Sequence, residues 1–570
     1  MAIALKNLKL SSTKESNVRA TTMDTIAALG FPLLMAFWLV FLIFREPIAA
    51  TTYRWQDDSY YYLLPAWNWG RTGQITTSWV GEVYGFQPLW FLVQAALCKV
   101  CTNLQVALKL ITGVQAFLFI GGTAMLGVVT ARIVNSRWVS PFVVAAATIA
   151  LPLQVSLLSG KENTLGLFLL ASFLVVITQS SWEVRRRLLF GALILGLLGI
   201  TRTNYAVSCV VVITAILLKF RPSWRVSVAT CLAFLLPVCG WFGFASSRFH
   251  SAMPLSGHMK ILEAKATLAT LFADHGMAIP TKLLGQDALA SVSSHTAMPS
   301  EPRAAVNVYK NQVATILSVR TLAFLVGIFG LLGLFAKPVG KCDNRRLWQV
   351  AGLLLAFVVP NALFNIFAMS PVLSYTTWYL MPEQALMIVA VPTLIGLAMS
   401  RNVLGTFKPA FLALLAVFGV ASKFRVNDWE VLSARYEHPD YQCYKNQDQL
   451  VAEFRKVWKK DDLIVCFNSG YFNYLLSDAK MENLDGLTAS LPYYKTVGDS
   501  IVVEGADSLS PKLWKYCHQI HAKYLIDFDK ADWTPSARPF ENRMDLSTAE
   551  LVVKSAPFHE GQERIYAFRL

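Results

Sequence analysis

Charged residues are scarce in this sequence. Asp, Glu, Lys and Arg make up only 15% of the 570 residues, whereas hydrophobic residues make up 55% and the mean hydropathy is +0.45. An ordinary soluble protein carries about 25% charged residues, so this composition excludes that class. Several apolar runs reach the roughly 18 residues that a transmembrane helix needs. The chain is therefore predicted to be a polytopic α-helical membrane protein.

Clusters of metal-binding residues are missing as well. The nine cysteines are scattered. The single C-x-x-C pair, Cys98 and Cys101, lacks the second pair or the histidines that a zinc site requires. We interpret this pair as part of a helix at the membrane edge. Three further cysteines lie toward the C-terminus, where the sequence allows one disulfide among them: Cys443, Cys466 and Cys517.

The sequence has a basic excess without the pattern of a nucleic-acid-binding protein. The formal net charge is +15, yet Lys and Arg fall mostly between apolar runs, with no basic face and no alternation with aromatic residues. This distribution excludes nucleic acid as a partner and indicates attraction to anionic lipids of a cytoplasmic leaflet. The sequence also contains no N-x-S/T sequon, which favours a bacterial membrane over a eukaryotic secretory one.

The chain lacks the signs of a cleaved leader and of a transporter. The first apolar run, Ile26 to Phe44, is too long for the core of a signal peptide and has no A-x-A cleavage site. We expect it to be a retained first span. No internal repeat and no matched pair of broken helices follows, in contrast to many secondary transporters.

The distribution of basic residues predicts the topology. The apolar run 88–100 decides it, because thirteen helical residues reach only about 20 Å against a hydrocarbon core of about 30 Å. If this run does not cross, five basic loops share the side of the N-terminus, as short cytoplasmic loops should. The prediction is eleven spans, a cytoplasmic N-terminus and an outer surface helix over 88–100. The five loops hold Arg132 and Arg137, Arg185 to Arg187, Lys219 with Arg221 and Arg225, Lys337 with Lys341, Arg345 and Arg346, and Arg401 with Lys408.

This topology divides the chain into three parts. Residues 1–23 form a cytoplasmic tail, and 24–423 form the membrane domain with outer loops over 45–104 and 247–318. Residues 424–570 carry more charge and short β-rich runs, which predicts a soluble α/β domain on the outer face. The expected strands are 462–467, 500–505, 523–528, 550–555 and 564–570, with a helix over 446–458.

Two adjacent carboxylates stand in the first outer loop. Asp57 and Asp58 lie in the stretch WQDDSYYYLL, among aromatic residues at the expected water–lipid interface. Charge near lipid is costly, so the pair either caps a surface helix in an interfacial aromatic belt or performs chemistry. Neighbouring residues of a helix point about 100° apart, so the two carboxylates cannot do the same job.

Seven stretches, in order along the chain, resemble the GT-C glycosyltransferases, multi-span enzymes that take sugar from a polyprenyl-phosphate donor. The branch is the bacterial one that resembles arabinofuranosyltransferases and protein mannosyltransferases. Each stretch is weak alone, but their order is specific. Three residues depart from the pattern, Lys161, Asn204 and Gln87, and leave the donor open. The stretches are DDSYYYL (57–63), YGFQPLW (84–90), SLLSGKENTL (156–165), GITRTN (199–204), MPLSGHMK (253–260), TWYLMP (377–382) and NSGYFNYLLSDAKMENLDGL (468–487).

Transfer of a sugar from polyprenyl phosphate needs a base for the acceptor hydroxyl and positive charge for the departing phosphate. Asp57 suits the base. Asp58 is left to orient the acceptor, to bind a cation or to pair with a basic residue such as Arg202. Glu162 is a third candidate catalytic carboxylate, with pairing to Lys161 as the structural alternative.

The donor and the sugar have candidate ligands of their own. Arg202 and Lys260 are predicted on the outer side, and each can hold a phosphate, Arg bidentately and Lys as a point charge. Snorkelling to the interface is the alternative for both. Helix anchoring or plain solvation is the alternative for the aromatic and histidine candidates. The candidate substrate-binding residues are Tyr61, His258, Trp378 and Tyr379.

The sequence thus predicts a membrane glycosyltransferase, hexosyl or pentosyl, that moves one sugar from a polyprenyl-phosphate donor to a glycan, lipid or protein acceptor. Inversion at the anomeric carbon is implied by the resemblance. No cofactor is identified, and a divalent cation, Mg²⁺ or Mn²⁺, stays open. The site is expected on the periplasmic or extracellular face of the cell (inner) membrane. Two alternatives remain: a glycan polymerase or ligase that uses a diphosphate-linked donor, and a non-enzymatic lipid or glycan transporter.

Overall fold

The computed structural model describes most of the first half of the chain and most of its C-terminal part. The described ranges are 22–55, 57–134, 158–252, 344–368, 439–467, 469–485, 488–498, 506–530, 544–557 and 563–570, together with a few isolated positions between them. The predicted outer loop 45–104 lies almost wholly within these ranges, whereas the predicted loop 247–318 lies almost wholly outside them.

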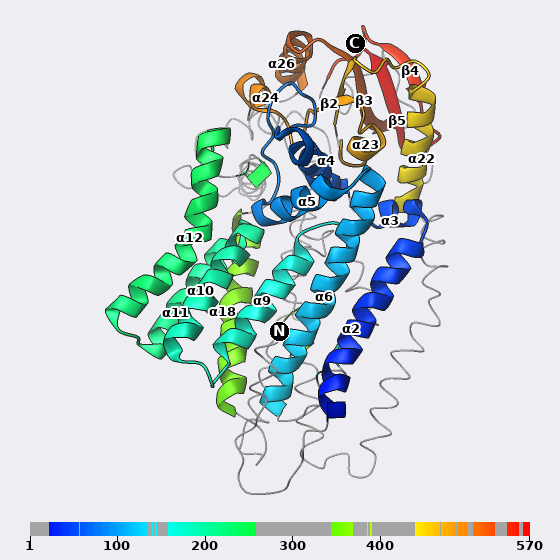
Figure 1. The fold of residues 1–570 in the computed structure, drawn as a ribbon. Helices are drawn as coiled ribbons and strands as arrows, with labels where there is room; N and C mark the ends of the chain where they lie inside the picture. The colour runs from blue at the N-terminus through cyan, green and yellow to red at the C-terminus, as the bar shows by residue number, and fades with distance from the viewer. Residues whose placement is uncertain are drawn as a thin grey trace, which may run out of the picture.

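Seven long helices of the described chain run alongside one another as a bundle (Figure 1). Large apolar side chains on their outer faces stay exposed, among them Leu34, Phe37, Leu218 and Leu236, each 62–70% exposed. Exposed apolar surface of this extent is typical of a face that meets lipid. The helices are α2 (Thr22–Arg45), α6 (Leu104–Val134), α9 (Asn163–Ile177), α10 (Val184–Thr201), α11 (Tyr205–Phe220), α12 (Trp224–Phe249) and α18 (Asn344–Ala368).

Length and composition identify two described helices that can cross a membrane, α6 and α12. The end of α2 and the short helix α3 (Ile48–Arg54) form a pair bent by 112°, which adds a third span if the pair is counted as one. Several predicted runs fall outside the described residues. The number of eleven spans therefore stays a prediction.

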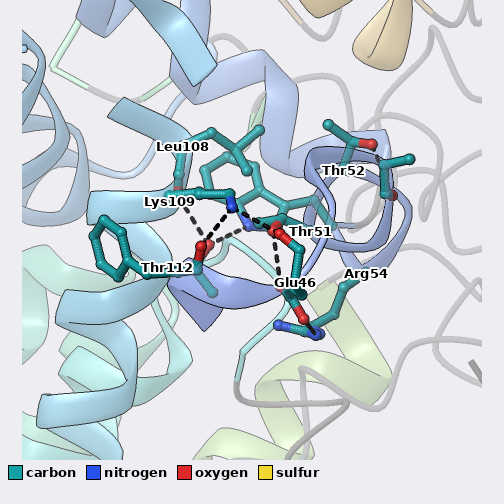
Figure 2. Close-up of polar contacts among 10 residues, drawn as sticks. Glu46, Thr51, Thr52, Arg54, Leu108, Lys109 and Thr112 are labelled. Carbon is teal, nitrogen blue, oxygen red and sulfur yellow. Dashed lines mark hydrogen bonds and ion pairs between the residues drawn. The ribbon is translucent and has the colours of Figure 1, made fainter. Parts of the chain in front are cut away.

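A polar network holds the bend between α2 and α3 (Figure 2). Glu46 accepts a hydrogen bond from Thr51 Oγ1 at 2.7 Å and pairs with Arg54. Lys109 Nζ, on α6, donates to the carbonyls of Phe44 and Glu46 at 3.0 and 2.7 Å. These contacts satisfy carbonyls that the end of α2 leaves without helical partners. The chain is thereby turned across the end of the bundle.

Two helices follow on the same end of the bundle. In Figure 1, α4 (Asp57–Thr72) and α5 (Pro88–Val100) lie across the ends of the long helices rather than alongside them. The helix expected over 88–100 is thus present with the expected bounds. It begins at Pro88, where a proline costs no hydrogen bond, and it buries Trp90 and Phe91. Its place on the outer membrane surface stays a prediction.

The C-terminal part contains a five-stranded sheet in the order β2-β1-β3-β5-β4. β1 pairs in parallel with β2 and β3, whereas β5 pairs antiparallel with β3 and β4. The strands are β1 (Leu463–Cys466), β2 (Lys480–Asn483), β3 (Ala522–Lys530), β4 (Glu550–Lys554) and β5 (Glu563–Arg569). The helices are α22 (Pro439–Phe454), α23 (Gly470–Leu475), α24 (Leu491–Thr496) and α26 (Ala506–Gln519).

Four of the five expected strands are present as β1, β3, β4 and β5, and the expected run 500–505 lies outside the described residues. β2 was not expected, because its four residues, Lys-Met-Glu-Asn, show too few apolar side chains to be recognised as a strand. The helix expected over 446–458 begins seven residues earlier, at Pro439. Cys466 and Cys517 are free cysteines, so the disulfide left open among Cys443, Cys466 and Cys517 is absent.

The sheet and the bundle meet through the loop after α4. Val83 and Ser490 form an antiparallel bridge, and the Leu491 amide donates to the Glu82 carbonyl at 3.1 Å. Ser78 donates to the buried Glu482 of β2 across the same boundary. The first loop and the C-terminal part therefore form one continuous structure.

Basic residues of the predicted cytoplasmic loops lie at the opposite end of the bundle. Arg132 on α6 donates to the Val175 carbonyl, and Arg346 on α18 donates to Ser180, just after α9. Arg187 on α10 stacks over Phe220 at the end of α11. Three of the predicted basic loops thus lie at one end of the described helices, as the topology requires.

Candidate functional site

The two adjacent carboxylates of α4 face different partners. Asp57 Oδ1 accepts a hydrogen bond from the backbone N–H of Tyr471, on α23, at 2.7 Å. Asp58 Oδ2 accepts from Lys161 Nζ at 2.8 Å. The Asp58 side chain is half exposed, whereas that of Lys161 is 3% exposed. Asp57 therefore points toward the C-terminal part of the chain and Asp58 toward the bundle.

The loop before α9 holds Lys161 in this place. Gly160 adopts φ +85°, and a Cβ there would lie 2.5 Å from the Trp55 ring, so only glycine fits. Its carbonyl accepts from Trp90 Nε1 at 2.8 Å and from Gln94 Nε2 at 3.2 Å. Gln115 bonds both the Gly160 N–H and the Lys161 carbonyl. The loop is thus fixed by side chains from neighbouring helices.

A buried ion pair lies next to Lys161. Arg202 Nη1, just after α10, is 3.1 Å from Glu162 Oε1, just before α9, and both side chains are at most 5% exposed. The sequence offered Arg202 as one possible partner of Asp58, and Lys161 as an alternative partner of Glu162. The ion pairs seen here join Arg202 to Glu162 and Lys161 to Asp58. Sequence separation gives no information on which of four nearby charges meet.

The three residues that depart from the family pattern all make specific contacts in this region. Lys161 bonds Asp58 as described. Gln87 Oε1 accepts from the Thr203 N–H at 3.0 Å. Asn204 Nδ2 donates to Asn361 Oδ1, on α18, at 3.1 Å. The departures thus belong to one polar region between α4, α9, α10 and α18.

The surroundings of Asp57 favour its protonated form. Burial raises its pKa to about 7, and the neighbouring carboxylates Asp58 and Asp485 add to the effect. The Tyr471 N–H and the charge of Lys161 act in the opposite direction. A carboxyl with a pKa near neutrality both holds and releases a proton under physiological conditions, which is the property of a general base.

Asp485 is a neighbour to which no sequence pattern assigned a role. It follows β2 and accepts a hydrogen bond from Tyr61 Oη at 3.3 Å. Burial, with help from Asp485 and Asp57, raises the pKa of Tyr61 well above its usual value, so its hydroxyl stays a donor. The one available signal is the stretch NLDGL, which contains Asp485 and carries part of the family resemblance.

The structure therefore brings together five of the nine candidate residues. Asp57, Asp58 and Tyr61 come from α4, Glu162 from the loop before α9, and Arg202 from the end of α10. In the described part of the chain, no three His, Cys, Asp or Glu side chains are grouped closely enough to hold a metal ion. The four remaining candidates, Lys260, His258, Trp378 and Tyr379, lie outside the described residues.

A search of solved structures finds similarity over most of the chain. One is ArnT from Cupriavidus metallidurans bound to undecaprenyl phosphate, at a TM-score of 0.49 and 13% identity over 94% of this chain and 97% of that one. Another is the oligosaccharyltransferase AglB from Archaeoglobus fulgidus, in complex with an inhibitory peptide and a dolichol-phosphate. Its TM-score is 0.47 and its sequence identity 11%, and the match covers 90% of this chain and 70% of that one. No family model and no curated protein matches the chain. At these TM-scores the likenesses assign no role to any residue.

Proposed function

We propose that this protein is a membrane glycosyltransferase that moves one sugar from a polyprenyl-phosphate donor to an acceptor hydroxyl. The observation that carries the proposal is the setting of Asp57. A carboxyl with a pKa near 7 lies at the end of an apolar helix bundle, in one cluster with two buried cations, Lys161 and Arg202. This is the combination of base and positive charge that the transfer requires.

The proposed reaction uses Asp57 as its base. Asp57 takes the proton of the acceptor hydroxyl while the acceptor oxygen forms a bond to the anomeric carbon. The bond from that carbon to the phosphate oxygen breaks, and its electron pair leaves with polyprenyl phosphate. Attack on the face opposite the departing phosphate inverts the anomeric configuration.

Arg202 and Lys161 supply the positive charge on the donor side. Both lie beside Asp58 and Glu162, whose charges oppose theirs, so the cluster as a whole is balanced until a ligand enters. The donor phosphodiester carries one negative charge, and the departing polyprenyl phosphate gains a second as the bond to the sugar breaks. Both cations can stabilise this growing charge without moving far, because they are already held in place. Lys260 is proposed as a further phosphate ligand on the sequence resemblance alone.

The active site is proposed to face the periplasm or exterior. The candidate site lies at the end of the bundle opposite Arg132, Arg187 and Arg346, and basic residues mark the cytoplasmic ends of membrane helices. The division into a cytoplasmic tail (1–23), a membrane domain (24–423) and an outer α/β domain (424–570) is part of the same proposal.

The function is tested by comparing envelope glycans of cells that carry the wild-type gene, a deletion, or the Asp57→Asn variant. Mass spectrometry should find glycans that lack one kind of sugar unit in the deletion and the variant, with the variant protein present in membranes. Lys456, in an exposed pair with Glu453, offers a matched control, and Lys456→Gln should leave the glycans unchanged. Identical glycans in all four strains would refute a sugar-transferring role.

A further inference from the structure

The parallel part of the sheet presents its carboxyl edge to Asp57. β1 and β2 are parallel, and the residues that follow their carboxyl ends are Ser469 with Gly470 and Asp485. A Cβ on Gly470 would lie 2.3 Å from the Asp57 carbonyl, so α23 begins directly against α4. In α/β sheets the space beyond the carboxyl ends of parallel strands is where ligands bind.

Negative charge is concentrated at this edge. Cys466, the last residue of β1, is buried, and its thiol pKa is raised first by that burial and then by the charges of Asp527, Asp485 and Asp57. Three carboxylates, from β3, the residue after the end of β2, and α4, are thus near enough to this thiol to act on its charge. The two buried cations of the site, Lys161 and Arg202, both belong to the bundle rather than to this part of the chain.

Two amide oxygens at the same edge have no donor among the described residues. Asn473 and Asn483 both donate to Ser469 Oγ, at 3.4 and 3.0 Å, and both side chains are 1% exposed. Their Oδ1 atoms accept no hydrogen bond within the described structure. Buried acceptors without donors are uncommon in folded proteins, and these two add to an edge that is already rich in acceptors.

Asp57 therefore stands between two chemically opposite sides. The bundle side offers cations, which suit a phosphate. The sheet side offers carboxylate and amide oxygens, which suit a ligand rich in hydroxyl donors and repel a negatively charged one. The donor and the acceptor of a transfer reaction must approach the base from different directions, and the charges separate these directions.

We propose that the carboxyl edge of β1 and β2 binds the acceptor as an uncharged carbohydrate, and that Asp485 positions its reacting hydroxyl next to Asp57. This assignment rests on the proposed function and adds the class of the acceptor to it. Asp485 is a positioning residue: it hydrogen-bonds acceptor hydroxyls, and Tyr61 orients it. An anionic acceptor, such as a uronic acid polymer or a phospholipid headgroup, is disfavoured at this edge.

The test uses the purified full-length protein in detergent. The probes are uncharged tetrasaccharides of arabinose, mannose and galactose, the anionic trisaccharide trigalacturonate, and undecaprenyl phosphate. We expect at least one uncharged probe to bind at least tenfold more tightly than trigalacturonate. Asp485→Asn should weaken that binding at least tenfold and leave undecaprenyl phosphate binding unchanged. The control Asp478→Asn removes an exposed carboxylate paired with Arg455 in the same part of the chain and should change neither.

The outcomes separate this inference from the proposed function. Tight trigalacturonate binding, no binding of any uncharged probe, or equal effects of Asp485→Asn and Asp478→Asn would each overturn the acceptor assignment. If the uncharged probe binds as described but undecaprenyl phosphate does not bind the wild type, the acceptor assignment is supported and the polyprenyl-phosphate donor is refuted. Tyr61→Phe, which removes the hydroxyl that bonds Asp485, should weaken carbohydrate binding in the same direction as Asp485→Asn.

Discussion

Two identical side chains at the start of α4 have different chemical properties because they are neighbours on a helix. The Asp57 side chain lies against α23, whereas the Asp58 side chain is half exposed and bonded to Lys161. Burial raises the pKa of Asp57 to about 7. The same residue type thus provides a base at one position and a counter-ion at the next.

The pH dependence of turnover should follow the ionisation of Asp57. Because the base must be deprotonated, kcat/KM is expected to rise with pH, with a midpoint near 7. Asp58→Asn removes a negative neighbour and leaves Lys161 without its partner. Both effects favour the ionised form of Asp57, so the midpoint should move to lower pH. A profile of the purified enzyme that is flat from about pH 5 to 9 would show that Asp57 is not the base.

The same pKa has a consequence for stability. The folded state raises the pKa of Asp57 above its unfolded value of 3.8, so the fold favours the protonated form. The contribution of Asp57 to the free energy of unfolding is fully present below about pH 4 and is lost as the pH rises through about 7. Asp57→Asn, which cannot ionise, should therefore melt at a higher temperature than the wild type at about pH 8, with the difference shrinking at about pH 5. If Asp57→Asn melts at a lower temperature than the wild type at about pH 8, the Asp57 carboxylate is not destabilised by burial.

The ion pair of Glu162 and Arg202 should be sensitive to removal of one partner. Arg202→Ala leaves a buried carboxylate without its cation, which typically costs about 3–5 kcal/mol. The double variant Arg202→Met with Glu162→Gln removes both charges and should recover most of that loss. Thermal denaturation in detergent can measure both. If Arg202→Ala is as stable as the wild type, the pair is not desolvated, and the role of Arg202 is confined to the donor.

At the scale of helices and strands, regular elements were predictable and their mutual contacts were not. The helix over 88–100 and four strands followed from local patterns, because apolar spacing and proline position act within one segment. The pairing of Lys161 with Asp58 joins residues 103 positions apart and depends on how the bundle packs. Asp485 escaped notice for a different reason: it follows β2, a strand that is short and polar. The sequence therefore identified most of the candidate residues, while their partners required the fold.

The contact between α4 and α23 should depend on Gly470. Alanine at this position would place its Cβ 2.3 Å from the Asp57 carbonyl and 2.4 Å from its carboxylate carbon. Overpacking of this kind typically costs about 1–3 kcal/mol, and in this case it also pushes the Tyr471 N–H away from Asp57. Gly470→Ala should lower both melting temperature and turnover. The matched control is Gly352→Ala on α18. A Cβ at this position has no neighbour within 4 Å, so the variant should change turnover little. Equal behaviour of the two variants would contradict the close contact.

The whole molecule has two chemically distinct ends. Arg132, Arg187 and Arg346 lie at one end of the bundle, and the candidate site and the sheet lie at the other. A membrane would separate these ends, as the proposed function requires for a lipid donor in the bilayer and an acceptor outside it.

Cysteine labelling of intact cells tests this orientation. In a cysteine-free version of the chain, single cysteines at the exposed positions Gln74 and Lys459 should react with a membrane-impermeant reagent. Cysteines at Ser181 and Ser223, both exposed at the opposite end, should react only after the cells are opened. Labelling of Ser181→Cys in intact cells would invert the topology and place the candidate site in the cytoplasm.

The Asp57 carboxylate is proposed to be the base of a sugar transfer. The most direct measurement is single-turnover transfer by purified wild-type and Asp57→Asn protein from the same polyprenyl-phosphate sugar. Asparagine keeps the shape and can still accept the Tyr471 N–H, but it cannot take a proton. We expect the rate to fall by about 10²–10⁴-fold while donor binding is kept. A variant that transfers sugar at nearly the wild-type rate would contradict the claim and leave Asp57 as a structural contact between α4 and α23.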